Sequence, residues 1–217
     1  MKRFKMLPNN TNGLLITFCG MDGCGKSTII DKVLQEFAQS TNEFEVTKQP
    51  TDNVRKSLIF RTFMDSPDPS SYEYRSLSLM AASDRVQHVN KVILPYLEKG
   101  KIVISDRYYY SCAANLWARG YTEDKWIYEI GQHIICPDIA FFLDVPVETA
   151  VQRVRSRKEE AERYIDMELQ YKLRENYIKL ARNNNGVLLS TLEPIDITFE
   201  KVIKKIYKVM EVKYGVV

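Results

Sequence analysis

Short apolar runs alternate with longer stretches of helical periodicity along the 217-residue chain. The short runs are rich in β-branched and aromatic residues and predict five strands, at 14–19, 44–48, 101–105, 139–145 and 187–190. The longer stretches predict helices at 27–39, 71–98, 111–116, 123–133, 147–157, 166–183 and 199–212. Strands that are apolar throughout and alternate with helices are typical of a parallel sheet covered on both faces. We therefore expect a three-layer α/β/α fold around a five-stranded parallel sheet, with right-handed crossovers.

Composition and charge narrow the class of protein. The chain has no repeat, low-complexity stretch or Pro/Gly-rich linker, so we expect a single domain over 1–217 with an N-terminal extension at about 1–12. A net charge of +3 is small for a nucleic-acid-binding protein. Four cysteines without a CxxC pair suit a reduced compartment and no zinc site. No stretch reads as a membrane span or signal peptide, so we expect a cytoplasmic protein with no membrane or nucleic-acid partner.

The stretch GMDGCGKST, residues 20–28, follows the first predicted strand and opens the first predicted helix. It matches the phosphate-binding P-loop in full, so the expected fold is that of a P-loop NTPase. Its glycines let successive backbone N–H groups point at a phosphate, and the positive end of the following helix adds attraction. We expect Lys26 to reach the β- and γ-phosphates and Ser27 to place its hydroxyl on Mg²⁺. The residues expected to bind the nucleoside triphosphate are Gly20, Gly23, Cys24, Gly25, Lys26, Ser27 and Thr28.

A polar pair follows the third predicted strand. In KIVISDRYYYS, Asp106 and Arg107 end a buried strand, at the carboxyl edge of the sheet where ligands of such folds bind. We expect Asp106 to hold Mg²⁺ directly or through water, and Arg107 to hold the transferred phosphoryl group or the phosphate of the acceptor. A surface ion pair at a strand end is the alternative for such a dipeptide alone, and the P-loop favours the catalytic interpretation.

Three segments together carry a family resemblance: GMDGCGKST, ASDRVQHVNKVILPYLEKGKIVISDRYYYS and PDIAFFLDVPVETAVQRVRSR. In this order they resemble the thymidylate kinase family, over about residues 14–205. The resemblance implies ATP-dependent phosphorylation of a nucleoside monophosphate, dTMP in the family, by a homodimer that uses Mg²⁺. It also implies a role for the acid inside the P-loop, because Asp22 would accept a hydrogen bond from the 3′-hydroxyl of the acceptor sugar. A solvated acid is the alternative for Asp22.

The resemblance further implies a small helical lid, at about 153–166. Cys24 stands where one subgroup of the family has a P-loop arginine, and the other subgroup supplies its transition-state cations from the lid. The run QRVRSRKEEAERY makes this chain similar to the second subgroup. Cations are needed there because negative charge spreads over three oxygens of the transferred group. We expect Arg155, Arg157 and Arg163 to act in this way, and Arg153 and Lys158 to lie on a solvated helix face.

The acceptor side departs from the family pattern. Lys48, Gln49 and Pro50 stand where the family has Arg-Glu-Pro, so the cation is kept and the acid is lost. Ala81 replaces a phenylalanine that stacks on thymine, a loss on the order of 1–3 kcal/mol of base contact. Arg85 is retained, and the resemblance implies that it hydrogen-bonds the base. His88 is expected to pack its helix, and Arg55 or Arg61 to hold the monophosphate. The expected acceptor site is Asp22, Lys48, Pro50, Arg55, Ala81, Arg85, Arg107, Ser111 and Asn115.

The departures leave several functions open. Other aromatic residues can replace the missing ring, the candidates being Tyr72, Tyr74, Tyr108, Tyr109 and Trp117. Alternatively, the chain is a kinase for another deoxynucleotide, a modified nucleotide or a nucleoside. A third hypothesis is a non-catalytic regulator that binds ATP. Arg107 argues against it, because a protein that only binds ATP has no need for an arginine that acts during transfer.

Overall fold

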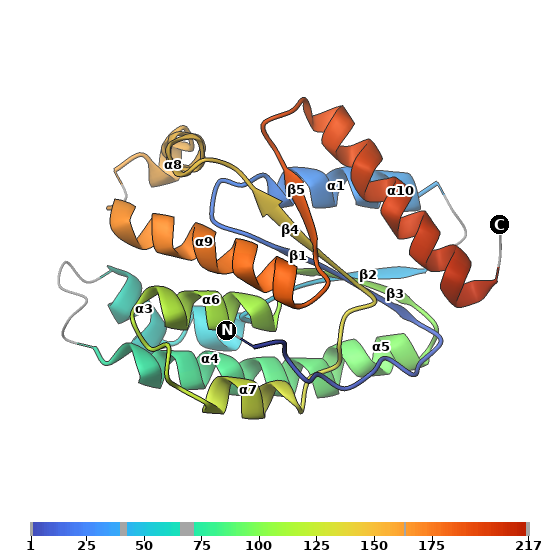
Figure 1. Ribbon diagram of the computed structural model, residues 1–217, viewed down its shortest axis with the longest axis horizontal. Helices are drawn as coiled ribbons and strands as arrows, with labels where there is room; N and C mark the ends of the chain where they lie inside the picture. The colour runs from blue at the N-terminus through green and yellow to red at the C-terminus, as the bar shows by residue number, and fades with distance from the viewer. Residues whose placement is uncertain (1, 40–42, 66–71, 163, 216–217) are drawn as a thin grey trace.

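The computed structural model describes residues 2–39, 43–65, 72–162 and 164–215, and it contains one parallel sheet. Its strands lie in the order β2-β3-β1-β4-β5, so β1 is central and β2 and β5 are the edges (Figure 1). The five strands are β1 (Leu14–Cys19), β2 (Phe44–Lys48), β3 (Ile102–Asp106), β4 (Ile139–Asp144) and β5 (Val187–Ser190). The predicted five-stranded parallel sheet is therefore confirmed, and each strand begins and ends within one residue of its predicted range.

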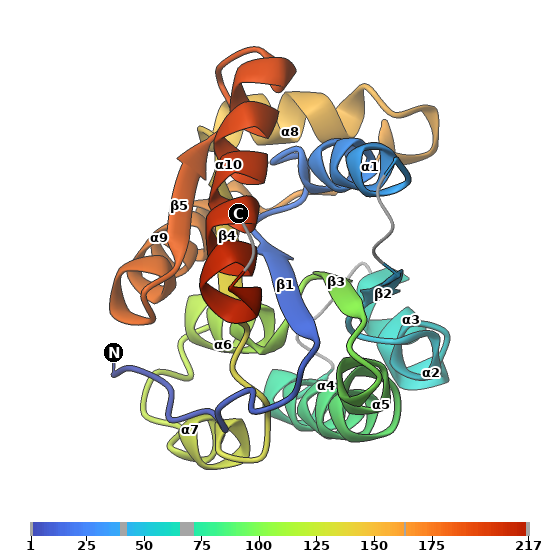
Figure 2. The ribbon, with the colours of Figure 1, turned by 90° about the vertical axis from the view of Figure 1, so that its right-hand side faces the viewer.

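Helices cover both faces of this sheet. α1 (Lys26–Phe37) and α10 (Ile195–Tyr214) pack together on one face, whereas α9 (Met167–Asn183) packs on the other, against β4 and β5 (Figures 1 and 2). α6 lies beside α9, and α4 lies beside α6. The remaining helical elements are α2 (Asp52–Arg55), α3 (Leu58–Asp65), α4 (Tyr74–His88), η2 (Val89–Ile93), α5 (Leu94–Glu98), α6 (Tyr109–Ala118), α7 (Trp126–Gly131), α8 (Val147–Arg155) and η3 (Lys158–Glu160).

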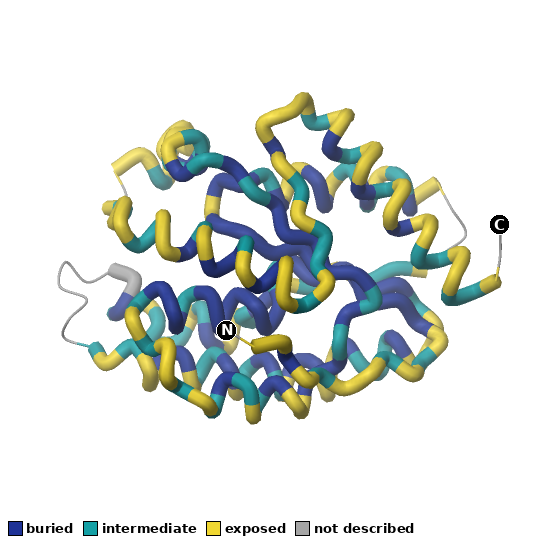
Figure 3. Tube along the Cα trace, in the orientation of Figure 1, coloured by how far each residue is buried: buried dark blue, intermediate teal, exposed yellow. Residues whose placement is uncertain are grey.

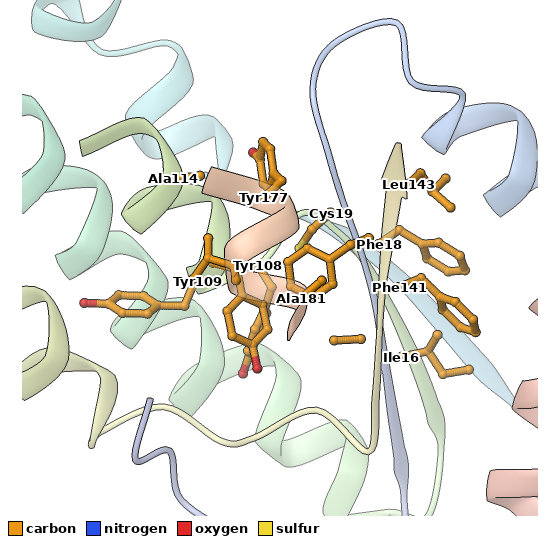
Figure 4. Close-up of a cluster of buried hydrophobic side chains, with 14 of the residues drawn as sticks. Ile16, Phe18, Cys19, Tyr108, Tyr109, Ala114, Phe141, Leu143, Tyr177 and Ala181 are labelled. Atoms are coloured by element: carbon orange, nitrogen blue, oxygen red, sulfur yellow. The ribbon is translucent and has the colours of Figure 1, made fainter. Parts of the chain in front are cut away.

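The core lies where the central strands meet these helices, and Figure 3 shows the buried chain concentrated there. β1 and β3 are buried along their whole length because layers cover both of their faces. Figure 4 shows buried side chains on both faces of the sheet: Cys19 and Tyr108 lie on the side of α9, with Tyr177 and Ala181. Phe18 and Phe141 lie on the opposite side, where their rings stack with centroids 5.0 Å apart. Burial raises the pKa of the Cys19 thiol to about 12, so this thiol acts as a neutral packing group.

Two features of the helices differ from the prediction. The helix predicted over 71–98 starts at Tyr74 and contains one π-helical turn, η2, just before Pro95. Proline has no backbone N–H to donate and its ring crowds the preceding turn, which accounts for the irregularity at this place. The short helices α2 and α3 were not predicted, because elements of four and eight residues hold too few turns for a periodic pattern.

The N-terminal segment packs on the body of the protein. The Phe4 ring is buried among Tyr109, Tyr110, Trp117 and Tyr128, with centroid distances of 5.0–6.2 Å. No helix in the described part of the chain combines the length and the apolar character that a membrane crossing requires.

Candidate active site

The carboxyl ends of three neighbouring strands bring the main candidate residues together. β1 and β3 pair with Phe18 opposite Asp106, and β2 and β3 pair with Lys48 opposite Asp106. β1 then continues into the P-loop, and β3 continues into Arg107. The predicted P-loop, the Asp-Arg pair and Lys48 therefore share one edge of the sheet, as expected for ligand sites in such folds.

The P-loop needs its glycines for backbone conformation and for close approach. Gly23 has φ +80° and Gly25 has φ +89°, values that favour glycine. A Cβ on Gly23 would lie only 2.2 Å from the carbonyl oxygen of Ala150 in α8, so a side chain there would push the two segments apart. Gly25 also caps α1, whose first turn carries no side-chain cap. The N–H groups at this helix end are thus available to an anion.

Lys26 is buried inside the loop that it follows. Its Nζ donates to the carbonyl oxygens of Gly20 at 3.0 Å and Met21 at 2.7 Å. Ser27, by contrast, is exposed on the first turn of α1, as is Thr28. Cys24 is fully buried with its Sγ 3.6 Å from the lysine Nζ. The ammonium group of Lys26 is therefore enclosed by the loop, whereas the hydroxyl residues Ser27 and Thr28 lie at the surface. The loop contains no arginine.

Asp106 has one satisfied and one unsatisfied carboxylate oxygen. Its Oδ2 pairs with Lys48 Nζ at 2.8 Å. Its Oδ1 is buried and has no hydrogen-bond partner among the described residues. A buried carboxylate oxygen without a partner is costly, on the order of 1–3 kcal/mol or more. A hydrated cation beside Ser27 would satisfy it, so these residues fit the predicted Mg²⁺ ligands.

Arg107 is held in an unusual backbone conformation that turns its side chain towards the P-loop. It has φ +70°, and its N–H donates to the carbonyl oxygen of Phe18 at 2.8 Å. The guanidinium donates to the Gly20 carbonyl at 3.1 Å and forms an ion pair with Asp22. A non-glycine residue keeps a positive φ only where the surroundings enforce it, which is common at functional sites. Asp22 of the P-loop and Arg107 of the Asp-Arg pair, which belong to separate sequence motifs, are therefore in contact.

On the side where the acceptor is expected, α4 and α6 present a buried guanidinium and a cation–aromatic cluster. Arg85 is 3% exposed; its Nη1 donates to the Ala81 carbonyl at 2.8 Å, and its Nε has no partner among the described residues. The Arg119 guanidinium lies 4.0 Å from the Tyr74 ring centroid and 5.8 Å from that of Phe63. Asn115 Nδ2 donates to its own helix at Ser111, and its Oδ1 accepts from Arg119 at 3.1 Å.

A comparison with known protein families shows to which family the chain belongs. A model described as thymidylate kinase matches residues 18–202, most of the chain. The chain belongs to the thymidylate kinase family. It is 41% identical over 173 residues to the probable thymidylate kinase of Thermococcus kodakarensis, covering 77% of this chain and 84% of that one. It is 39% identical to the probable thymidylate kinase of Pyrococcus horikoshii, with 78% and 83% coverage. With the probable thymidylate kinase of Staphylothermus marinus it shares 31% identity, over 90% and 96% of the two chains.

Among the aromatic residues expected to replace the family's stacking ring, three are excluded by the structure. Tyr108, Tyr109 and Trp117 are buried in the core, where the two tyrosine hydroxyls donate to the carbonyls of Ile135 and Ile127. Tyr72, half-buried just before α4, remains, and so does Tyr74, beside Arg119. Phe63 joins it with ring centroids 5.3 Å apart, and sequence reasoning missed this residue because α3 was not predicted.

The segment expected to form a lid, and the helix α8 that leads into it, are partly anchored. Ala150 in α8 lies against Gly23, and Arg153 donates to the carbonyl and hydroxyl oxygens of Thr191 at 2.9 and 3.3 Å. The prediction that Arg153 lies on a solvated face is therefore wrong, because this guanidinium ties α8 to the loop after β5. Arg155 is exposed at the end of α8, and Arg157 lies beyond that end, 3.8 Å from Glu160. Arg163 lies outside the described residues.

The two arginines expected to compete for the monophosphate differ in their surroundings. Arg55 ends α2 and is half-buried, and its guanidinium makes no hydrogen bond or ion pair within the described ranges of the chain. Arg61 is exposed on α3. Pro50 lies in the segment between β2 and α2, and the Ser111 hydroxyl is buried on α6.

Proposed function

We propose that this chain transfers the γ-phosphoryl group of ATP to dTMP, producing dTDP and ADP. The observation that carries this proposal is the contact between Arg107 and the P-loop, in a chain that matches the thymidylate kinase family over residues 18–202. Arg107 follows β3 but lies against Gly20 and Asp22, so a cation from a second strand is delivered to the phosphate loop. Phosphoryl transfer needs a cation there, since charge develops on the transferred group.

The ATP side of the site uses the P-loop and the first turn of α1. Gly20, Gly23, Cys24 and Gly25 would supply backbone N–H groups, and Thr28 extends this surface. Lys26 would exchange its contacts with loop carbonyls for phosphate oxygens. Ser27 and Asp106 would hold Mg²⁺, which when bound neutralises charge on the β- and γ-phosphates.

The acceptor side orients the monophosphate in line with the γ-phosphate. Arg55, half-buried and without an ion pair in the described parts of the chain, is the stronger candidate for the acceptor phosphate. Arg85 would use its unpaired Nε and remaining N–H groups on the base. Lys48 and Pro50 border the phosphate, whereas Ala81, Ser111 and Asn115 line the base side. Tyr74 and Phe63 would provide the apolar wall that Ala81 does not.

The lid would complete the site on closure. Because Arg153 and Ala150 fix the first part of α8, movement would be confined to the later part of the lid, which carries Arg155, Arg157 and Arg163. Closure would bring these cations to the transferred group and keep water from it. In this proposal the whole of 1–217 works as one kinase domain with a lid at about 153–166.

Other parts of the proposal concern the setting of the protein. We place it in the cytoplasm, in support of which all four cysteines are free thiols. We also propose a homodimer, as the resemblance implies, and sedimentation velocity at several protein concentrations measures this directly.

The function is tested by ADP release with ATP and Mg²⁺ against dTMP, dUMP, dCMP, dAMP, dGMP, UMP and thymidine. We expect dTMP to have the highest kcat/KM, because Tyr74, Phe63 and Arg85 form an apolar and hydrogen-bonding wall for one base. Lys26→Ala serves as the control for ADP released by contaminating enzymes. If another compound in the set has a kcat/KM at least tenfold higher than that of dTMP, that compound and not dTMP is the acceptor.

Asp22 should recognise the sugar, and a substrate pair isolates that contact. The wild-type protein should prefer dTMP to 3′-deoxythymidine monophosphate by roughly ten- to a hundredfold in kcat/KM, the value of a hydrogen bond to a charged acceptor. In Asp22→Ala this preference should disappear, even though loss of the Arg107 pair lowers both rates. Asp22→Asn keeps an acceptor oxygen and should retain part of the preference. An undiminished preference in Asp22→Ala would exclude the sugar contact.

A further inference from the structure

Two side chains on one face of α4 hold the end of β2 and the residues that follow it. His88 Nε2 lies 2.7 Å from Thr47 Oγ1, and His88 Nδ1 lies 3.0 Å from Gln49 Nε2. One turn earlier, Asp84 accepts from the N–H of Thr51 at 2.8 Å and from its hydroxyl at 2.5 Å. Residues 84 and 88 are four apart and therefore neighbours on the helix surface. The segment 47–51 is thus fastened to α4 at three places.

The chemistry of the partners determines how His88 is bonded. With the amide of Gln49 placed so that Nε2 faces His88, this nitrogen can only donate, and the matching tautomer carries the imidazole proton on Nε2, facing Thr47. Burial lowers the pKa of His88, which keeps the ring neutral between these two neutral groups. Gln49 itself is fully buried. Its Oε1 has no hydrogen-bond partner among the described residues, so the hydrogen bond to His88 and the backbone N–H are what hold this residue in place.

The same segment connects to the expected catalytic groups. The backbone N–H of Gln49 donates to the Asp106 carbonyl at 3.0 Å, and Lys48 pairs with the Asp106 carboxylate. At its other end, Thr51 caps α2 through its hydroxyl, and α2 ends at Arg55. Asp84 and His88 therefore lie on one side of a segment that carries Lys48, contacts Asp106 and leads into Arg55.

We propose that Asp84 and His88 are positioning residues for the acceptor nucleotide, acting through Thr51 and Gln49 on Lys48 and Arg55. This proposal rests on the proposed function, because it assigns Arg55 to the acceptor phosphate. It goes beyond the expectation that His88 packs its helix: the side chain sets the place of a substrate-binding segment. A displacement of about 1 Å in a substrate-positioning group can cost a hundredfold in rate, so the effect on turnover should be large compared with the effect on folding.

Variants of His88 separate the two hydrogen bonds. An asparagine oxygen is as many bonds from Cβ as ring Nδ1, and a glutamine terminal atom as many as ring Nε2. His88→Asn can therefore serve Gln49, and His88→Gln can serve only Thr47. We expect His88→Gln to lower kcat/KM for dTMP by roughly ten- to a hundredfold, with the Kd for ATP within twofold of wild type. His88→Asn should recover most of that loss.

Asp84→Asn tests the hydrogen bonds to Thr51. The carboxylate accepts from both the N–H and the hydroxyl of Thr51, whereas the amide has only one oxygen to accept and places an NH₂ group against the other donor. Asp84→Asn should also lower kcat/KM for dTMP while leaving the Kd for ATP within twofold of wild type. Gln87→Ala, an exposed substitution on the same helix turn, is the matched control and should leave all constants unchanged. Thermal unfolding of each variant establishes that it is folded at the assay temperature.

The outcomes distinguish this proposal from the proposed function. Wild-type protein that does not phosphorylate dTMP would overturn the proposed function, and the variants would then be compared with the acceptor that the nucleotide set identifies. Folded His88→Gln and Asp84→Asn proteins with wild-type kcat/KM would overturn the positioning role. So would a parallel loss of ATP affinity, because that would indicate general damage to the site.

Discussion

Arg107→Ala should lower kcat for dTMP phosphorylation by about a thousandfold, the lower end of what an arginine at the transferred phosphoryl group contributes. The guanidinium is held against Gly20 and Asp22, and the residue keeps φ +70° to bring it there. Alanine at the same φ removes the cation without adding backbone strain, since arginine already has a Cβ. Affinity for ATP should change little, because Lys26 and the P-loop backbone remain. Quenched-flow measurement gives the rate constant of the transfer step separately from product release, and this rate constant should fall by the same factor.

Two further substitutions sharpen this prediction. Arg107→Lys should not restore the rate, because an ammonium cannot replace a planar fork that spans Gly20 and Asp22. Arg75→Ala is the matched control, since Arg75, on α4, forms a comparable ion pair with Asp124 at 2.6 Å. This substitution should leave kcat within twofold of wild type. A folded Arg107→Ala protein with kcat within tenfold of wild type would remove Arg107 from the transfer step.

Phe4→Ala should lower the free energy of unfolding by about 3–5 kcal/mol. The ring is 5% exposed and contacts four aromatic residues, the nearest being Tyr128 at a centroid distance of 5.0 Å. Gly131 makes room for it, since a Cβ there would lie 2.9 Å from the Phe4 ring. Loss of the ring leaves a cavity that α6 and α7 cannot close without repacking. Urea denaturation followed by circular dichroism and by tryptophan fluorescence measures the change.

The neighbouring Leu7 supplies the control for the N-terminal segment. Leu7 is 47% exposed, so Leu7→Ala should change the free energy of unfolding by no more than about 0.5 kcal/mol. A change below 1 kcal/mol in Phe4→Ala would show that residues 2–9 contribute nothing essential to the fold. The larger change would make this segment an integral part of it, although the sequence pattern described it only as an extension.

The strands and the phosphate loop could be predicted from sequence because each depends on residues that are close together in the chain. Five short runs of four to seven residues are enough for five strands, and the P-loop needs only residues 20–27 between a strand and a helix. The Asp-Arg pair is recognisable for the same reason, because Asp106 ends the strand that positions it and Arg107 follows directly. These local patterns were sufficient for the fold class, for the family, and for the place of the P-loop sequence between β1 and α1.

The contacts that complete the site join residues far apart in sequence, and only the tertiary structure decided them. Asp22 and Arg107 are 85 residues apart, and the hydrogen bonds from His88 reach back 41 and 39 residues to β2 and the segment after it. No periodicity indicates that Arg153 binds Thr191 instead of solvent, or that Trp117 packs on Phe4 and not beside the acceptor. Such pairs depend on which helix faces which strand end. That arrangement follows from packing all layers at once, whereas sequence patterns report one element at a time.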